Sequence, residues 1–437
     1  MAEQVRSLKT GIKYKNTPIG KIPVDWEVKR LEDTASNEKY SFTGGPFGSD
    51  LKEDSHTDDG VRVIQLQNIG DGKFLNEYKI FTSEEKAGQL KNCNIYPGDI
   101  IIAKMADPVA RACIIPDEDK RYLMASDGIR LSINKEKCDV NFMLYAINSP
   151  NFRKNAESHS TGSTRLRIGL TELRNLLIAI PPLKDQKKIA EILTTVDEAI
   201  EKTDQIIEKT KEVKKSLMQK LLTRGIGHKK FKKTEIGEIP EKWQLAPLRN
   251  VSIKGSIKDP RNFPDQKFRY VDVSSVSNEF YKVTDFQVVN GRNAPSRARK
   301  EIKWKDIIYA TVRPYLKRIA VVPKELDGEI CSTGFCVIKC NPKLSHYKYV
   351  FYILQTDWIT EKFIGLQRGS NYPAITDNDI YNQIISMPEI GEQEQIAKIL
   401  SSVDDEIEKE SNHKEQLELL KKGLMQVLLT GKIRVSV

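Results

Sequence analysis

Few side chains in this sequence have the types and spacing that catalysis requires. The run Pro116-Asp117-Glu118-Asp119-Lys120 contains the carboxylates and lysine of some nuclease metal sites, but adjacent residues in one turn cannot surround a metal as groups from separate strands do. The Pro-Pro pair in Ile180-Pro181-Pro182-Leu183 lacks the preceding polar residue and the following aromatic residue of DNA amino-methyltransferases. No G-x-x-x-x-G-K-[ST] phosphate loop is present. The sequence therefore predicts a binding protein without catalytic residues.

No metal or other cofactor site is predicted either. The cysteines form no C-x-x-C pair and the histidines are scattered, whereas zinc sites need closely spaced ligands. We therefore expect buried or partly buried free thiols and no metal. The residues concerned are Cys93, Cys113, Cys138, Cys331, Cys336 and Cys340, with His56, His159, His228, His346 and His413.

The charge balance favours an acidic partner. Among 437 residues, 70 are Lys or Arg and 60 are Asp or Glu, a formal net charge of +10. This excess fits nucleic-acid binding without proving it. No apolar run approaches the roughly 18–20 residues that cross a bilayer. No hydrophobic stretch follows the first six residues, so we expect a cytoplasmic location and no membrane partner.

The sequence contains two copies of one repeat. Residues 17–26 recur as 234–243, both ending in Ile-Pro-x-x-Trp, at an offset of 217 residues (234 − 17). Further on, Asp99-Ile100-Ile101 matches Asp306-Ile307-Ile308 at an offset of 207 residues (306 − 99), and this offset then holds to the end. The first copy therefore carries about ten extra residues, and the pattern indicates an internal duplication.

The ends of the copies also match one another. Residues 222–226, 429–433 and 8–12 share a Leu-x-x-x-Ile pattern with a Thr inside it. Residues 1–16 are thus predicted to continue the C-terminal repeat, as two copies around a pseudo-twofold axis with adjacent termini would require. Coincidence in a short string is the alternative.

Each copy opens with a segment of strand-like runs broken by turns, over residues 17–182 and 234–388. The runs have alternating or β-branched residues, and Pro97-Gly98 and Asn341-Pro342 supply breaks. We predict two globular mixed α/β domains in an α+β fold, with a strand order that cannot be derived. The predicted strands cover residues 61–67, 100–104, 268–276 and 331–339.

Each copy then continues as a long helix, over residues 183–223 and 389–430, linked by the basic stretch 224–233 and followed by a tail at 431–437. Apolar residues recur at spacings of four and three, typical of a coiled-coil seam. We predict an antiparallel pair within the chain; the alternative is a coiled coil between chains. Polar residues such as Lys214, Lys414 and Lys421 interrupt the seam and set its register or mark a docking site. The seam comprises Ile189, Leu193, Val196, Ile200, Ile207, Leu217, Leu221, Ile396, Leu400, Val403, Ile407, Leu417, Leu424 and Leu428.

Several motifs resemble one family over nearly the whole chain, twice and in order. They are Ile-Pro-x-x-Trp at the start of each copy, P-x-x-x-[DE]-Q-x-x-I-x-x-x-L at the start of each helix, and a Gly-Ser element at Gly162-Ser163 and Gly369-Ser370. The loop Gly44-Gly45-Pro46-Phe47-Gly48-Ser49-Asp50-Leu51-Lys52 is similar to family members and is missing from copy two. The chain resembles the specificity subunit of Type I restriction–modification systems.

This resemblance implies a non-catalytic subunit with two target-recognition domains, 17–182 and 234–388, joined by paired spacer helices. Its implied partners are double-stranded DNA, two methyltransferase (modification) subunits and the restriction/translocase subunits. S-adenosylmethionine, ATP and Mg would belong to those partners and not to this chain. Because the two domains differ in sequence, we expect an asymmetric target in two parts with an unread gap set by the helices.

Candidate DNA contacts are polar and basic residues that read bases or meet phosphates. In the first domain they are Gln65, Gln67, Asn68, Lys104, Arg111, Arg130, Ser163, Arg165 and Arg167. In the second domain they are Arg269, Ser275, Arg297, Arg299, Arg313, Tyr315, Lys317, Arg318, Ser370, Asn371 and Tyr372. Two other functions stay open: a coiled-coil scaffold that binds protein, and the target-recognition part of a self-contained modification enzyme.

Overall fold

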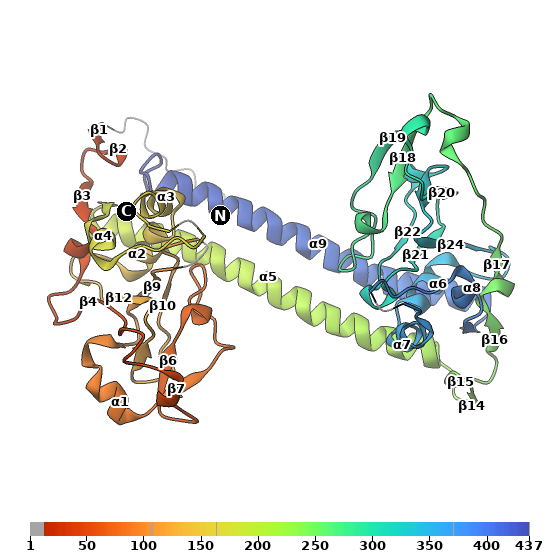
Figure 1. Cartoon of the computed structure of the whole chain (residues 1–437), viewed down its shortest axis with the longest axis horizontal. Helices are drawn as coiled ribbons and strands as arrows, with labels where there is room; N and C mark the ends of the chain where they lie inside the picture. Colours follow the sequence, from red (N-terminus) through yellow and green to blue (C-terminus); the bar gives the residue numbers. More distant parts are fainter. Residues whose placement is uncertain (1–12, 106–107, 163, 370, 437) are drawn as a thin grey trace. The chain divides into compact units, whose positions relative to one another are not determined.

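The computed structural model describes residues 13–105, 108–162, 164–369 and 371–436. The chain divides into two compact units: unit 1 contains residues 1–204 and 413–437, and unit 2 contains residues 205–412. Each unit combines one globular domain, called domain 1 and domain 2 below, with parts of the two long helices α5 (Leu183–Arg224) and α9 (Ile390–Leu428) (Figure 1). The match predicted for residues 8–12 lies outside the described residues.

Helices α5 and α9 run antiparallel within each unit. In unit 1, Lys421 pairs with Asp197 and Lys414 with Asp204, each at 2.6 Å, so the numbers rise along one helix as they fall along the other. In unit 2, Lys214 pairs with Asp404 at 2.6 Å. The predicted intramolecular antiparallel pair is thus confirmed, and the polar seam positions Lys214, Lys414 and Lys421 hold its register.

The apolar stripes of the helices pack against the domains as well as against each other. Ile189, Leu193 and Leu428 belong to the main core of domain 1, and Ile396 and Leu400 to that of domain 2. The helix ends are therefore part of each domain's core. Of the other seam positions, Val196, Ile207, Leu221 and Leu417 are buried, while Ile200, Leu217, Val403, Ile407 and Leu424 are partly exposed.

Domain 1 is built on two sheets. The first has the strand order β10-β9-β12-β4 and is antiparallel, and the second has the order β5-β7-β6-β11-β8, in which β6 and β11 are parallel. The bounds are β4 Phe42–Gly44, β5 His56–Thr57, β6 Val61–Ile64, β7 Ile80–Thr82, β8 Asn94–Ile95, β9 Ile100–Ala103, β10 Ala112–Ile114, β11 Tyr122–Met124 and β12 Gly128–Leu131.

The central strand β9 is buried on both faces. Ile100 and Ile102 face the main core, which the long helices complete, while Ile101 and Ala103 belong to the cluster that reaches the second sheet. This double burial explains the unbroken apolar run. The second sheet and α1 (Glu84–Gln89) lie on the side of the domain away from α5 and α9 (Figure 1).

The remaining elements of domain 1 border the long helices. They are α2 (Val140–Ile147), α3 (Pro150–Ser158), α4 (Leu170–Asn175), the hairpin β1 (Tyr14–Thr17) with β2 (Gly20–Pro23), and the pair β3 (Glu27–Arg30) with β13 (Leu177–Ile180). Asp139 and Ser149 cap the N-termini of α2 and α3, because their side chains accept hydrogen bonds from first-turn N–H groups.

Domain 2 repeats this plan, with sheets β22-β21-β24-β17 and β19-β18-β23-β20. Over the residues that the structure describes, its second sheet has no counterpart of β5, in line with its shorter sequence. The bounds are β14 Phe231–Thr234, β15 Gly237–Pro240, β16 Gln244–Pro247, β17 Ser252–Ile253, β18 Lys267–Val271, β19 Gln287–Asn290, β20 Ala298–Glu301, β21 Ile307–Ala310, β22 Ile319–Val321, β23 Ile330–Ser332, β24 Phe335–Cys340, β25 Ile384–Met387, α6 Tyr347–Leu354, α7 Asp357–Leu366 and α8 Asp377–Tyr381.

Some local expectations differ from the structure. The run 331–339 forms two strands with a turn at Thr333-Gly334, and 268–276 ends in a short 3-10 helix, Val273–Ser275. The basic linker continues into strand β14, which pairs with β15. Among the described residues, no helix is long and apolar enough to cross a membrane, and no cluster of His, Cys, Asp and Glu is arranged to hold a metal.

Candidate nucleic-acid interface

A buried glutamine joins each long helix to its domain. In domain 1, Gln186 accepts a hydrogen bond from the Asp139 N–H at 2.8 Å and donates to the carbonyls of Lys137 and Pro181 at 3.1 and 2.8 Å. Gln393 repeats these bonds in domain 2 with His346, Leu344 and Pro388. The side-chain amide of each glutamine bonds only to main-chain groups through its donors and its acceptor. The glutamine of the P-x-x-x-[DE]-Q motif therefore has a structural role.

In each domain, a tyrosine binds the same long helix as the buried glutamine does, which is α5 in domain 1 and α9 in domain 2. The Tyr145 hydroxyl donates to Asp197 at 2.7 Å, and the Lys421 ammonium of the opposite helix lies 5.7 Å from the Tyr145 ring centroid. In unit 2, Tyr352 donates to Asp404 at 2.6 Å, beside Lys214. Burial is the main cause of the raised pKa of Tyr145 and Tyr352, so both hydroxyls stay protonated and donate.

The start of each domain closes against the end of a long helix. Near the C-terminus of the chain, Arg434 pairs with Asp25 and with Asp185, each at 2.6 Å. In unit 2, Glu392 accepts hydrogen bonds from the Trp243 indole N–H at 3.0 Å and the Ile226 N–H at 2.9 Å. The tryptophan of Ile-Pro-x-x-Trp and the acidic residue before the glutamine are thus structural.

The loops that follow the central strand of domain 2 form a compact group. After β21, the Ile375 N–H donates to the Thr311 carbonyl at 2.9 Å and the Arg313 N–H donates to Pro373 at 2.7 Å. Arg313 and Lys317 have φ of 49° and 48°, a left-handed conformation that is costly for residues other than glycine. This strained turn presents Arg313, whose guanidinium carbon lies 5.5 Å from the Tyr372 ring centroid.

Domain 1 has the same arrangement at the end of β9. The Ile168 N–H donates to the Lys104 carbonyl at 3.0 Å, Met105 bridges to Arg167, and Ala110 has a left-handed φ of 60°. The Lys104 ammonium donates to the Ser126 carbonyl at 3.1 Å. Burial and then the neighbouring Arg167 lower the pKa of Lys104, so it gains from an anion placed beside it.

A glycine loop borders this group in domain 1. The Gly45 N–H donates to the Gly128 carbonyl at 2.8 Å, and a Cβ at Gly45 would lie 1.9 Å from the Ala125 carbonyl oxygen, so only glycine fits. The Lys104 ammonium lies beside Gly44. The loop then presents Phe47, which is 82% exposed. We call these loops the loop edge of each domain. In domain 1 the loop edge comprises the described parts of 44–50, 104–111 and 161–168. In domain 2 it comprises the described parts of 311–318, 333–334 and 368–375.

Both copies match one family model, that of the type I restriction modification DNA specificity domain, over residues 23–212 and 241–419. The chain belongs to this family. Members are non-catalytic DNA-recognition subunits of type I restriction–modification systems, which agrees with the lack of catalytic motifs in the sequence.

Full-length relatives support this assignment. The chain is 30% identical to the putative type I restriction enzyme MjaX specificity subunit of Methanocaldococcus jannaschii, over 97% of each chain. It is 29% identical to the MjaVIII specificity subunit of the same organism, over 95% of each. The crystal structure of the type I system S subunit from M. genitalium has the same fold, with a TM-score of 0.55, 14% identity, and 92% and 96% of the two chains covered.

Well over half of the predicted DNA contacts of this specificity subunit lie at or next to the loop edge. Gln65 and Gln67 flank Leu66, whose carbonyl accepts from Arg111, and the Arg297 carbonyl accepts from Thr333. Lys317 is there too, but paired with Asp357 at 2.6 Å. The others are Lys104, Arg165, Arg167, Arg313, Tyr315, Asn371 and Tyr372, whereas Ser163 and Ser370 lie outside the described residues.

Several candidates have structural roles instead, among them Arg318 of the loop edge. Arg130 is buried and pairs with Asp99 at 2.7 Å, and the buried Asn68 amide donates to the carbonyls of Leu75 and Tyr78. Ser275 is buried. Main-chain carbonyls hold the guanidinium groups of Arg269, Arg299 and Arg318. Their types match nucleic-acid contacts, but their partners lie within the domain.

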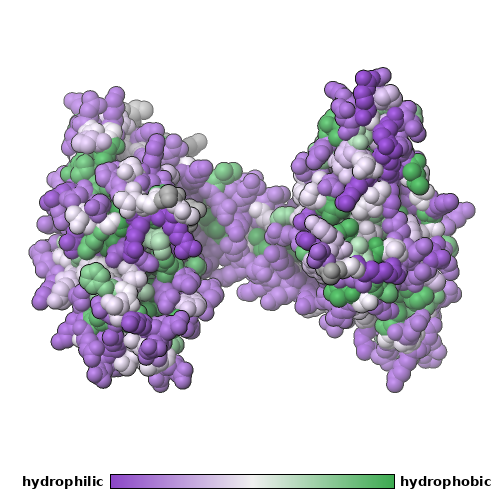
Figure 2. All heavy atoms as spheres, viewed as in Figure 1, coloured by the Kyte–Doolittle hydropathy of each residue, from purple (hydrophilic) through white to green (hydrophobic). Residues whose placement is uncertain are grey.

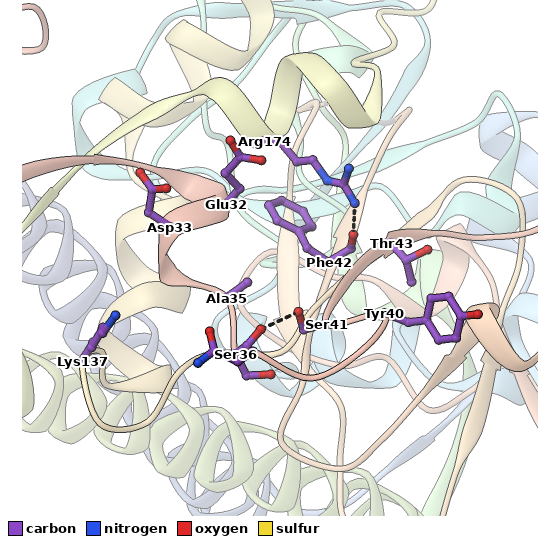
Figure 3. A pocket seen from close by; sticks show the side chains of 11 residues that line it. Glu32, Asp33, Ala35, Ser36, Tyr40, Ser41, Phe42, Thr43, Lys137 and Arg174 are labelled. Carbon is purple, nitrogen blue, oxygen red and sulfur yellow. Dashed lines mark hydrogen bonds between the residues drawn. The ribbon is translucent and has the colours of Figure 1, made fainter.

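A polar pocket of about 410 Å³ lies in domain 1, beside the 3-10 helix Leu31–Thr34 (Figure 3). Glu32 and Asp33 contribute carboxylates, and Lys137 and Arg174 contribute cations. Arg174 donates to the Phe42 carbonyl, and the Ser41 hydroxyl donates to Ser36 at 2.7 Å. Because carboxylates accompany the cations, the pocket lacks the excess positive charge that a phosphate backbone needs.

Proposed function

We propose that this chain reads an asymmetric DNA target in two parts, one half-site for each domain, as the specificity subunit of a type I restriction–modification complex. The observation that carries the proposal is the duplicated loop edge, built on the same scaffold with different side chains. At the offset of 207 residues, Arg165 corresponds to Tyr372 and Lys104 to Thr311. Different side chains on one scaffold favour different bases, so the two half-sites differ.

The charges at the loop edges support contact with DNA. Within the described part of the chain, the side chains of Arg165, Arg297 and Arg313 have no carboxylate partner. An exposed guanidinium without a carboxylate partner is suited to a phosphate or to the O6 and N7 atoms of guanine. Arg167 is paired with Asp127 at 2.6 Å, and that exposed pair can open to meet a phosphate.

The long helices would set the unread gap and dock two modification subunits. Leu419 and Leu420 on α9 and Val213 on α5 are exposed apolar side chains outside the contacts with the domains. Exposed apolar groups on a helix suit a partner helix better than water. The modification subunits would supply S-adenosylmethionine chemistry, and restriction/translocase subunits would supply ATP- and Mg-dependent cleavage. A cytoplasmic location belongs to the same proposal.

Single-molecule sequencing of methylated genomic DNA tests this function. Cells that carry the chain with its modification partners should acquire methylation at a gapped, two-part motif. Replacing residues 17–182 with the matching domain of a relative should change one half of the motif and leave the other half and the gap unchanged. Continuous motifs, or no methylation that depends on the chain, would contradict the proposal and favour a protein-binding scaffold.

A further inference from the structure

Each domain holds one large aromatic ring in solvent at its loop edge. Phe47 in domain 1 is 82% exposed and Tyr372 in domain 2 is 74% exposed, more than any other Phe, Tyr or Trp among the described residues. A ring left in water forgoes the stabilisation that burial provides. Hydrophilic residues cover most of the visible face of each unit, with smaller hydrophobic patches between them (Figure 2).

Both rings sit on turns that main-chain hydrogen bonds close. The turn of Phe47 is closed by a hydrogen bond from the Asp50 N–H to the Phe47 carbonyl at 2.9 Å, next to the close approach at Gly45. The turn of Tyr372 is closed by paired hydrogen bonds between Arg368 and Ala374 at 2.9 and 3.0 Å. The main chain therefore holds each ring outward before any partner arrives.

The surroundings of the rings are cationic and polar. Arg313 covers one face of Tyr372, the neighbouring Asn371 is exposed, and the exposed Arg368 is paired with Asp379 at 3.2 Å. Near Phe47, the Lys104 ammonium lies beside Gly44 of the same loop. A protein partner would be expected to meet a wider apolar patch. A single exposed ring on a loop that also holds a cation matches the way proteins stack on nucleobases while they neutralise the adjoining phosphate.

We propose that Phe47 and Tyr372 each stack on a nucleobase in the half-site that their domain reads. This inference rests on the proposed function of the chain. Bases inside a duplex expose their faces only when a step opens or a base turns out, so each domain opens its half-site locally. The domains use different loops, because Tyr372 corresponds to Arg165 and the Phe47 loop has no counterpart in domain 2.

The test uses the full chain in complex with its modification subunits, and duplexes that carry 2-aminopurine at successive positions of the methylated motif. Fluorescence of 2-aminopurine rises where the base loses its stacking neighbours. Wild type should show such a position in each half-site. Phe47→Ala should remove the signal from one half-site only, and Tyr372→Ala from the other only.

Each alanine variant should also bind the target about 5- to 150-fold more weakly, the range for loss of one base–aromatic stack. Tyr372→Phe, which keeps the ring, should behave like wild type. Because both positions are exposed, the substitutions leave the core intact. Signals that neither variant changes belong to bases extruded for methylation by the modification subunits.

Three results would overturn the inference. Unchanged affinity and fluorescence in both alanine variants would show that the rings do not meet bases, while the proposed function stands. Loss of the modification subunits on purification of a variant, with unchanged DNA affinity, would show that the ring contacts protein. Absence of salt-sensitive DNA binding by the wild-type complex would remove the proposed function itself, and this inference with it.

Discussion

At the scale of single residues, the duplication places one aspartate in two different environments. Asp99 in domain 1 is buried and pairs with the buried Arg130. Its counterpart Asp306 is equally buried, but Val337 replaces the arginine and the nearest cation, Lys339, is 3.9 Å away. Burial raises the pKa of Asp306 to about 6, despite a hydrogen bond from the Lys303 N–H. Domain 2 therefore carries a poorly compensated carboxylate at neutral pH.

Asp306→Asn should stabilise domain 2 above pH 6. The pKa of Asp306 is raised on folding, from 3.8 to about 6. The folded state therefore favours the protonated carboxyl. The stability that Asp306 contributes to domain 2 is fully present below pH 3.8 and is lost as the pH rises through 6. Asn imitates the neutral acid, and the gain should grow to at most roughly 3 kcal/mol at pH 8. Hydrogen exchange of domain 2 as a function of pH measures it.

Asp99→Asn is the matched control in domain 1. It leaves the buried Arg130 without its carboxylate, so it should destabilise that domain by about 3–5 kcal/mol at neutral pH. Equal effects of the two substitutions, or a gain from Asp306→Asn that does not depend on pH, would contradict this explanation.

Gln186→Leu should destabilise unit 1. The leucine would leave the Asp139 N–H and the carbonyls of Lys137 and Pro181 buried without partners, at a cost of about 3 kcal/mol. Urea unfolding monitored by hydrogen exchange measures the change. Gln219→Leu, an exposed position on the same helix, should shift stability by no more than about 0.5 kcal/mol; a similar loss there would point to helix propensity instead.

At the scale of elements, ion pairs between α5 and α9 hold the two helices together where polar residues interrupt the apolar stripe. Lys214 and Asp404 pair at 2.6 Å with side chains 13% and 32% exposed, and Tyr352 packs beside them. The same three residue types meet as Lys421, Asp197 and Tyr145 in unit 1. Their repetition links helix register to domain position in both units.

Reversing one charge in this pair should weaken unit 2, and reversing both should restore it. Lys214→Glu places a carboxylate beside Asp404 and should cost about 1–3 kcal/mol, most of which Asp404→Lys recovers in the double variant. Protection of α5 in hydrogen exchange reports the effect. Lys209→Glu, at an exposed position of α5, controls for charge alone; additive effects of the two single substitutions would disprove the coupling.

The sequence predicted the helices well because their period and repetition survive in any environment. The order of the strands in the sheets could not be predicted, because strands such as β6 and β11 pair in parallel although nearly sixty residues separate them. Site prediction failed where residue type does not reveal burial: Arg130 and Asn68 have the side chains of DNA contacts but bond within the domain. The exposure of Phe47 was not predicted for the converse reason, because a phenylalanine usually indicates core.

At the scale of the whole molecule, both long helices contribute to both units, so their common length is expected to govern the gap in the target. Insertion of four helix-forming residues after Asp204 and four after Asn412 adds about 6 Å to each helix, or one to two base pairs. Methylome sequencing should show unchanged half-sites with a gap longer by one or two. Insertion into α5 alone breaks the register between α5 and α9 and should abolish methylation. An unchanged gap in the double insertion would show that helix length does not set the gap.

Unit 1 is discontinuous in sequence, whereas unit 2 is a single stretch, 205–412. The core of domain 1 includes Leu428, with Leu424 and Ile433 packed against it, and Arg434 closes on Asp25. During synthesis, the core of domain 1 therefore cannot be completed before residues 424–434 have left the ribosome, whereas unit 2 needs no residue after 412. Truncation of the chain before Leu424 should therefore expose apolar core residues of domain 1, at the opposite end of the sequence, while unit 2 keeps all of its residues.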